Sequence, residues 1–221
     1  MLSLSRSSAN RLTESLIPRF LGDTLFDKIA RTVCRAGCLP RKELFETWEA
    51  ARRIRRRFRG GRVVDFACGH GLLGSILLLL DDSSPEVLAI DRRIPDSAQK
   101  VFNCLQAEWP RLRGRVELLE GALQEIELDQ EDLVVSIHAC GGLTDLILDR
   151  AAAARCRVAV LPCCHDLESA DLGGLQGWLE GPVAVDVTRV ARLRDQGYHV
   201  VTQQIPADIT PQNRLLLGTP C

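Results

Sequence analysis

The sequence predicts an α/β fold, a doubly wound sheet of seven strands that ends in an antiparallel hairpin and follows an N-terminal helical extension. Three observations support this. Strand-like and helix-like segments alternate from residue 62 onward. The apolar runs VVSI (134–137) and VAVL (158–161) are typical of central strands buried on both faces. Finally, PADITPQN joins the last two strand-like segments without a helical pattern, so these strands should pair antiparallel.

The chain divides into a basic helical extension, residues 1–60, and a sheet domain, residues 61–221. We expect helices over about 11–34 and 41–58 in the extension, separated by the break GCLP (37–40). Apolar periodicity and turn residues predict the elements of the sheet domain. The expected strands are 62–67, 86–91, 115–120, 132–138, 157–162, 198–205 and 214–218, and the expected helices are 71–80, 96–109, 144–154 and 186–196.

Charge is spread unevenly along the chain. The net charge is −1, yet residues 1–62 carry 15 Lys and Arg against 6 Asp and Glu. Such asymmetry indicates an anionic partner such as a nucleic-acid backbone, although a solvated helix face explains the same pattern. The densest basic run comprises Arg52, Arg53, Arg55, Arg56, Arg57 and Arg59.

Cysteine content and the N-terminus bear on location. Nine Cys, an odd number, without a signal-peptide pattern predict a reducing, cytoplasmic setting and no disulfide framework. The first residues, MLSLSRSSANRL, are rich in Ser and Arg, as in organelle transit peptides. We expect an ordinary surface helix there instead. No apolar run reaches the ~20 residues needed to cross a bilayer.

A glycine-rich segment, RVVDFACGHGLLG, spans residues 62–74. Gly69 and Gly71 allow a tight turn and the close approach of a ligand to the backbone. The apolar residues that follow have helical spacing, so a helix should begin near Gly71 with its free N–H groups toward the ligand. The segment also matches G-x-G-x-x-G, the fingerprint of dinucleotide sites.

Two carboxylates favour S-adenosyl-L-methionine (SAM) over a dinucleotide. Asp65 lies four residues before Gly69, where it would repel a pyrophosphate but suit a cationic amino group. Asp91 lies 20 residues after Gly71, the spacing expected for a carboxylate that accepts ribose hydroxyls. A seven-stranded sheet with a closing hairpin is also the plan of class I SAM-dependent methyltransferases. The alternative is a structural glycine turn with a helix-capping Asp.

Cys and His residues follow the fourth and fifth predicted strands. These strands should be neighbours, and ligands bind at the carboxyl ends of such strands. A His could act as a general base, a Cys as a nucleophile, or the set as zinc ligands. Their spacing fits no established zinc pattern, so we predict no metal; small packing side chains are the remaining alternative. The candidate catalytic residues are His138, Cys140, Cys163, Cys164 and His165.

These motifs resemble a particular methyltransferase family. HACGGLTD (138–145), followed by PCCH (162–165), is similar to the H-x-C-G-x-x-T-D and C-C-H or C-C-Y runs of that family. PRKELFE (40–46) is similar to a P-K-K-x-H-E stretch, with Phe45 in place of the His. The family includes eukaryotic tRNA acceptor-stem 2′-O-methyltransferases and the methyltransferase-like part of glutathione S-transferase C-terminal-domain-containing protein.

The resemblance implies SAM binding and makes RNA, tRNA or rRNA, the leading substrate class. The zinc-binding modules that precede the catalytic domain in the tRNA enzymes have no counterpart here, so tRNA specificity does not carry over. A SAM-binding or RNA-binding module without transferase activity, and a small-molecule methyltransferase, are the alternatives. The candidate cofactor contacts are Lys42, Asp65, Ala67, Cys68, Gly69, Gly71, Asp91, Arg92, Gly121, Ala122 and His138.

Overall fold

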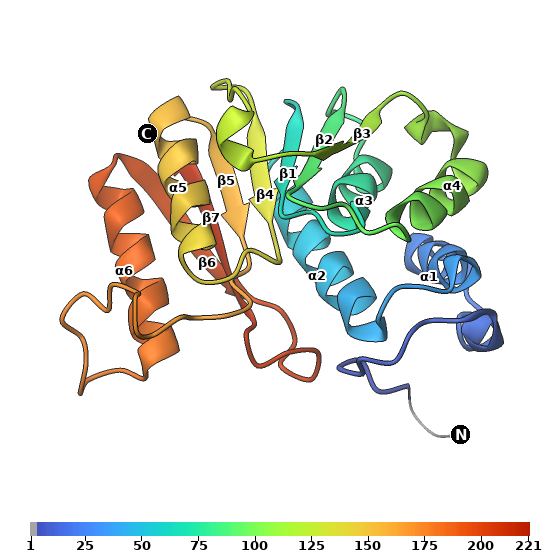
Figure 1. Cartoon of the computed structure of the whole chain (residues 1–221), viewed down its shortest axis with the longest axis horizontal. Coiled ribbons are helices and arrows are strands. Elements are labelled where there is room, and N and C mark those ends of the chain that lie inside the picture. Colours follow the sequence, from blue (N-terminus) through green and yellow to red (C-terminus); the bar gives the residue numbers. More distant parts are fainter. Residues whose placement is uncertain (1–3) are drawn as a thin grey trace.

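The computed structural model describes residues 4–221 and contains one seven-stranded sheet in the order β3-β2-β1-β4-β5-β7-β6 (Figure 1). The first five strands are parallel, whereas β7 runs antiparallel to both of its neighbours, β5 and β6. The predicted sheet and its closing hairpin are therefore confirmed. The strands are β1 (Val63–Phe66), β2 (Val87–Asp91), β3 (Val116–Glu120), β4 (Leu133–Ser136), β5 (Arg157–Val160), β6 (Tyr198–Gln204) and β7 (Arg214–Pro220).

Helices cover both faces of the sheet (Figure 1). Helices α1 (Leu25–Ala36), α2 (Arg41–Arg57), α3 (Leu72–Leu80) and α4 (Ala98–Glu108) share one apolar core with alternate strand residues such as Val63 and Val135. Helices α5 (Gly142–Ala154) and α6 (Gly181–Asp195) pack on the opposite face, over Val64 and Val134. Three short 3-10 helices complete the fold: η1 (Glu14–Arg19), η2 (Pro110–Leu112) and η3 (Leu123–Glu125).

The expected continuous helix over residues 11–34 is wrong. The chain forms η1, breaks, and starts again as α1 at Leu25. The Arg31 guanidinium stabilises the break, because it donates hydrogen bonds to the carbonyls of Phe20 and Gly22, which in a continuing helix would accept backbone N–H groups. The Thr24 hydroxyl then accepts the Asp27 N–H as the N-cap of α1.

The surface helix expected at the N-terminus is also wrong for residues 4–12, because they form no helix and η1 begins only at Glu14; residues 1–3 lie outside the described residues. The remaining predicted elements are confirmed, with shifts of a few residues at their ends. The largest shift is at α6, which starts at Gly181 rather than 186, because Pro182 fits the first turn of a helix, where no N–H partner is needed. Within residues 4–221, no helix combines the length and apolar character that a membrane span requires.

Two opposite edges of the sheet have different roles. The carboxyl edge is where β1, β2, β4 and β5 end, and the amino edge is where they begin. Helix α2 runs from one to the other. Near its start, Glu43 lies 3.3 Å from the His70 imidazole of the glycine turn. Beyond its end, the Arg59 and Gly60 carbonyls accept hydrogen bonds from Arg157 at the start of β5.

Candidate active site

The glycine segment forms a tight turn between β1 and α3. Gly71 has φ +67°, and a Cβ there would meet Leu118 Cδ2 at 2.6 Å, so only glycine fits. Gly69 has φ +54°, and a Cβ there would meet no atom within 4 Å. Ala67 also adopts a positive φ, +54°, which is uncommon for a residue with a side chain. The turn thus presents backbone to open space, as a ligand site requires.

Asp65 is a buried carboxylate at the end of β1. Its Oδ2 accepts the Gly74 N–H at 3.1 Å. Burial raises the pKa of Asp65 to about 7; the Gly74 N–H opposes this shift, and the negative charge of Asp91 adds to it. Within residues 4–221, no ion pair joins Asp65 to a cationic side chain. A cationic ligand group would therefore relieve an unfavourable charge.

Asp91 stands beside the turn at the end of β2. Its Oδ2 accepts the Gly69 N–H at 2.9 Å, and its carbonyl accepts the Gly121 N–H at 2.9 Å. Gly121 and Ala122 follow β3, so the structure brings these predicted contacts next to Asp91. Arg92 is exposed directly after β2. The Asp91 carboxylate is thus in a position to accept ribose hydroxyls.

A narrow cleft with essentially no free volume in this structure lies between the glycine turn, α2 and the segment after β4. His138 lies in its wall together with Asp65, Ala67 and Cys68, which brings these four predicted residues together. Burial raises the pKa of the Cys68 thiol well above its usual range, so Cys68 packs as a neutral side chain. The walls of the cleft are Glu43, Thr47, Asp65, Ala67, Cys68, Leu72, Leu73, Ile137 and His138.

Sequence reasoning expected Lys42 of α2 at the cofactor site but missed Glu43 and Thr47 of the same helix. Glu43 and Thr47 line the cleft, and Glu43 also holds the His70 imidazole, whose other nitrogen is 2.9 Å from Ser97 Oγ. The predicted contact Lys42 pairs with Glu46 at 3.3 Å. A Glu one residue after Lys42 gave no signal of its own, because only the packing of α2 on the sheet brings it near the glycine turn.

The predicted Cys and His group separates into two parts. The Sγ atoms of Cys140, Cys163 and Cys164 lie within 4.8 Å of one another, which confirms that they gather at the carboxyl edge. His165 points elsewhere: its Nε2 lies 2.8 Å from Asp186 Oδ1 on α6, and its side chain is only 3% exposed. His138 lies in the wall of the cleft beside the glycine turn. The five residues therefore do not form one site: the three Cys lie together, His165 contacts α6, and His138 lies beside the glycine turn.

Asp186 is the centre of a charged network that includes His165. Arg214 Nε lies 2.6 Å from Asp186 Oδ2, and Arg189 Nη1 lies 3.3 Å from Asp186 Oδ1. Arg189 also forms two hydrogen bonds with Asp145 of the 138–145 motif. Burial alone would raise the pKa of Asp186, but hydrogen bonds from His165 and Arg214 hold it below its usual value. Asp186 is therefore a fixed anion that orients the His165 ring.

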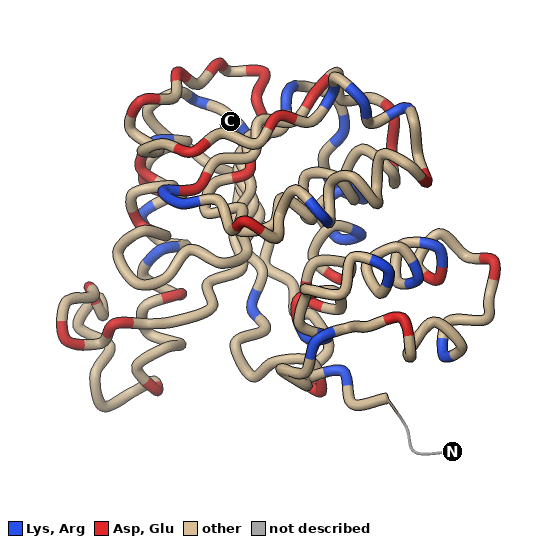
Figure 2. Tube along the Cα trace, turned by 45° about the vertical axis from the view of Figure 1, so that its right-hand side comes forward, with Lys and Arg blue, Asp and Glu red and all other residues tan. Residues whose placement is uncertain are grey.

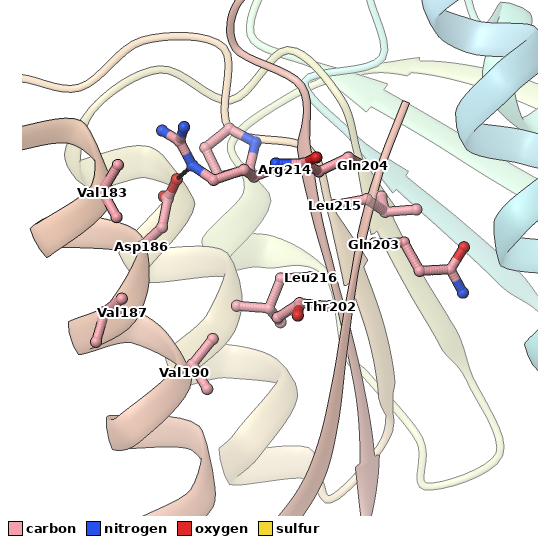
Figure 3. A pocket seen from close by; sticks show the side chains of 11 residues that line it. Val183, Asp186, Val187, Val190, Thr202, Gln203, Gln204, Arg214, Leu215 and Leu216 are labelled. Atoms are coloured by element: carbon pink, nitrogen blue, oxygen red, sulfur yellow. Dashed lines mark hydrogen bonds and ion pairs between the residues drawn. The ribbon is translucent and has the colours of Figure 1, made fainter. Parts of the chain in front are cut away.

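A cavity of about 620 Å³ lies between α6 and the β6–β7 hairpin, away from the glycine turn (Figure 3). Apolar side chains from α6 face Thr202 and Leu216 across it, and the Asp186–Arg214 pair lies at one end (Figure 3). Pro162, next to Cys163, also lines the cavity. Its volume is in the range of small-molecule sites. The network and cavity were not predicted, since they depend on how α6 packs against β7.

The basic run occupies the second half of α2 and extends toward the amino edge, although Arg53 Nε donates to the Gln204 carbonyl at the end of β6. The structure corrects the expectation for Arg55, whose side chain is buried and donates hydrogen bonds to the Leu77 carbonyl and Ser84 Oγ. Arg55 therefore supports packing and cannot reach a phosphate. Arg52 and Arg53 pair with Glu49, and Arg59 pairs with Asp81. Positive and negative positions are intermixed along the trace (Figure 2), and Arg56 and Arg57 are exposed.

The chain is similar to known proteins in both sequence and structure. A family described as methyltransferase domain matches residues 43–170. The Drosophila melanogaster glutathione S-transferase C-terminal domain-containing protein homolog is 25% identical over 204 residues, covering 72% of this chain and 33% of that protein. The chain thus spans about a third of the length of this curated relative.

The solved structures show the same fold at low sequence identity. An O-methyltransferase family protein from Burkholderia thailandensis has a TM-score of 0.54 and 18% identity, covering 95% of this chain and 63% of that one. The SAM-dependent methyltransferase SibL has a TM-score of 0.52 and 17% identity, covering 95% and 66%. The B. subtilis m1A22 tRNA methyltransferase TrmK has a TM-score of 0.50 and 12% identity, covering 78% and 65%.

The fold and the turn at the carboxyl edge are those of a methyltransferase domain, and SAM is the methyl donor that we test against its residues. The residues fit this cofactor, because the buried Asp65 needs a cationic partner and the space above Gly69 is open. The match over residues 43–170 places the chain in the methyltransferase-domain family.

Proposed function

We propose that this protein transfers a methyl group from SAM to an acceptor in RNA, with tRNA or rRNA as substrate. The choice of SAM as methyl donor is supported by the buried Asp65 carboxylate, whose pKa is raised to about 7 and which lies beside an open glycine turn. The resemblance of the 138–145 and 162–165 motifs to tRNA acceptor-stem methyltransferases supports an RNA acceptor. The tRNA enzyme among the structural neighbours shows that a related fold serves such a substrate.

The chain's own residues would bind and orient the reactants. Bound SAM supplies a methyl group already activated by its sulfonium. Asp65 would meet the cationic amino group of the cofactor, directly or through water, and Asp91 its ribose hydroxyls. His138, in the wall of the same cleft, would take the proton of an acceptor hydroxyl. Positioning of the acceptor in line supplies most of the remaining acceleration.

His165 would act at the carboxyl edge of the sheet, on the side of α6. Its ring is held by Asp186, and Asp186 is held by two arginines, so the imidazole has a fixed orientation. A His oriented by a buried carboxylate is a common arrangement for proton transfer. We therefore assign His165 to positioning of the acceptor between the cofactor cleft and the cavity along α6.

RNA would contact the amino-edge arginines as a second, separate surface. Arg56 and Arg57 are exposed there, whereas the methyl would be transferred at the opposite edge. A folded RNA large enough to reach both edges is required. Each lost phosphate contact should lower the slope of log K against log salt by about 0.9 for duplex RNA treated like B-DNA. Arg56→Gln should show this reduction, and Arg113→Gln, an exposed control near β3, should not.

The decisive test is mass spectrometry of nucleosides from a strain lacking this protein, compared with its parent. Loss of one methylated nucleoside, restored by the wild-type gene but not by an Asp65→Asn gene, supports the proposal. An unchanged nucleoside profile together with normal SAM binding would indicate a binding module without transferase activity.

The cavity along α6 favours a second candidate, a small-molecule methyltransferase. A volume of about 620 Å³ with mainly aliphatic walls suits a compact, partly apolar acceptor better than a phosphate backbone. In this case methyl transfer would depend little on salt and would be unchanged in Arg56→Gln. Replacing Val187 in the cavity wall with Trp would then block activity, whereas an RNA acceptor outside the cavity would still be methylated.

A further inference from the structure

Three cysteine thiols from two separate loops meet at the carboxyl edge. Cys140 follows β4, and Cys163 and Cys164 follow β5, yet their Sγ atoms all lie within 4.8 Å of one another. Cys140 Sγ and Cys163 Sγ are 3.1 Å apart, although 23 residues separate them. Four thiolates around zinc, at Zn–S ≈ 2.3 Å, would be about 3.8 Å apart. The three thiols therefore already have nearly the separation that a shared zinc ion requires.

The backbone holds this arrangement in place. Cys140 and Cys164 form an isolated parallel bridge, in which the Gly141 N–H donates to the Cys164 carbonyl at 3.2 Å. Thr144 Oγ1 donates to the Ala139 carbonyl at 2.9 Å, and Arg189 donates to the Gly141 carbonyl at 3.1 Å. The loops that carry the thiols are thus fixed by contacts that do not involve the thiols themselves.

The chemistry of three sulfur ligands suits a soft cation. A soft divalent ion would stabilise three thiolates and displace their protons.

We propose that Cys140, Cys163 and Cys164 bind a zinc ion with an open fourth position. Cys140 and Cys164 are exposed, so water can complete the coordination from the solvent side. The ion would tie the loop after β4, which carries His138, to the loop after β5, which carries His165. This inference departs from the sequence expectation of no metal, which considered spacing along the chain, and it does not depend on methyl transfer or on RNA.

Metal titration of the full chain tests this site. The protein is purified under reducing conditions, freed of metal with a chelator, and titrated with Co²⁺, whose thiolate charge-transfer absorption reports sulfur ligands. We expect about one Co²⁺ per chain, displaced by Zn²⁺, and zinc in protein prepared without the chelator. Absence of a charge-transfer band while all thiols react as free would overturn the proposal.

Variants distinguish a specific zinc site from nonspecific binding of metal by exposed thiols. Loss of a group outside the coordination sphere costs 10–100-fold in metal affinity, so Cys164→Ser, which removes a ligand, should weaken binding by at least about 100-fold. Cys164 is exposed, and this change should leave the fold intact by circular dichroism. Cys164→His, which keeps a ligand, should restore binding. Cys221→Ser, at an exposed thiol beyond β7, is the matched control and should bind as wild type; equal loss in Cys221→Ser would contradict the assignment.

Discussion

Replacing Asp65 with Asn should stabilise the cofactor-free protein and weaken SAM binding at the same time. The charged form of Asp65 is unfavourable in the fold, where its pKa is about 7 rather than 3.8. One pKa unit corresponds to 1.36 kcal/mol. At pH 8 the ionisation of Asp65 therefore lowers the free energy of unfolding by about 4 kcal/mol, compared with a carboxyl group that stays protonated. The Asn amide oxygen can still accept the Gly74 N–H, so the gain is not offset by a lost hydrogen bond.

The direction of the Asp65 pKa shift determines how the free energy of unfolding changes with pH. Because the folded pKa lies above the unfolded value, the folded state binds more protons between about pH 4 and 7. Wild-type stability therefore falls, relative to Asp65→Asn, as pH rises through this window. Urea unfolding at pH 4 to 8 measures the difference, with Asp195→Asn, an exposed carboxylate at the end of α6, as control. An Asp65→Asn protein that is less stable than wild type at pH 8 would refute the assigned burial.

The same variant should bind SAM at least about tenfold more weakly at pH 8, because the ion pair with the cofactor's cationic group is lost. At pH 6 the wild type should release a proton on binding, since Asp65 ionises when the cation arrives. Calorimetry in two buffers of different ionisation enthalpy measures that proton, and no buffer dependence would contradict the role of Asp65.

Three further predictions follow from individual side chains. Asp91→Ala should weaken SAM binding by at least about tenfold in calorimetry, because it removes the ribose acceptor and the Gly69 contact; unchanged affinity would contradict this role. Arg55→Met should lower the free energy of unfolding by about 1–3 kcal/mol, since two buried acceptors lose their partner, whereas the exposed Arg56→Met should change it by less than about 0.5 kcal/mol. Asp186→Asn should be destabilising at pH 7 in urea unfolding, and the difference from wild type should shrink as pH falls through the depressed pKa of Asp186. A difference that grows toward low pH would show that Asp186 is not held as an anion.

The parts of the fold that the sequence predicts are those set by local pattern. Strands such as β1 and β4 are apolar and flanked by turn residues, so their positions follow from a few residues each. The glycine turn is equally local, because Gly69 at φ +54° and Gly71 at φ +67° adopt a backbone conformation that glycine allows and most other residues avoid. Asp65 and Asp91 follow from their places at the ends of adjacent strands.

The parts that the sequence does not predict depend on packing between distant segments. The helix expected over 11–34 satisfies apolar periodicity, but Arg31 competes for the carbonyls of Phe20 and Gly22. Arg55 has the same local pattern as its exposed neighbour Arg56, and only the packing of α2 on α3 buries it. The residue type alone could not separate a phosphate ligand from a buried structural arginine.

The candidate site shows the same division. Strand order placed Cys140 near Cys163 and Cys164, and the structure confirms it. The partner of His165 lies 21 residues further on, at Asp186 in α6, and Arg214 joins from β7. These contacts cross a loop without regular structure, so neither spacing nor periodicity reports them.

The measurement that tests the central claim most directly is isothermal titration of the full-length chain with SAM. The account predicts saturable binding to about one site per chain, weakened in both Asp65→Asn and Asp91→Ala and unchanged in Asp195→Asn. Absence of binding by correctly folded wild-type protein at millimolar SAM would contradict the assignment of the glycine turn as a cofactor site.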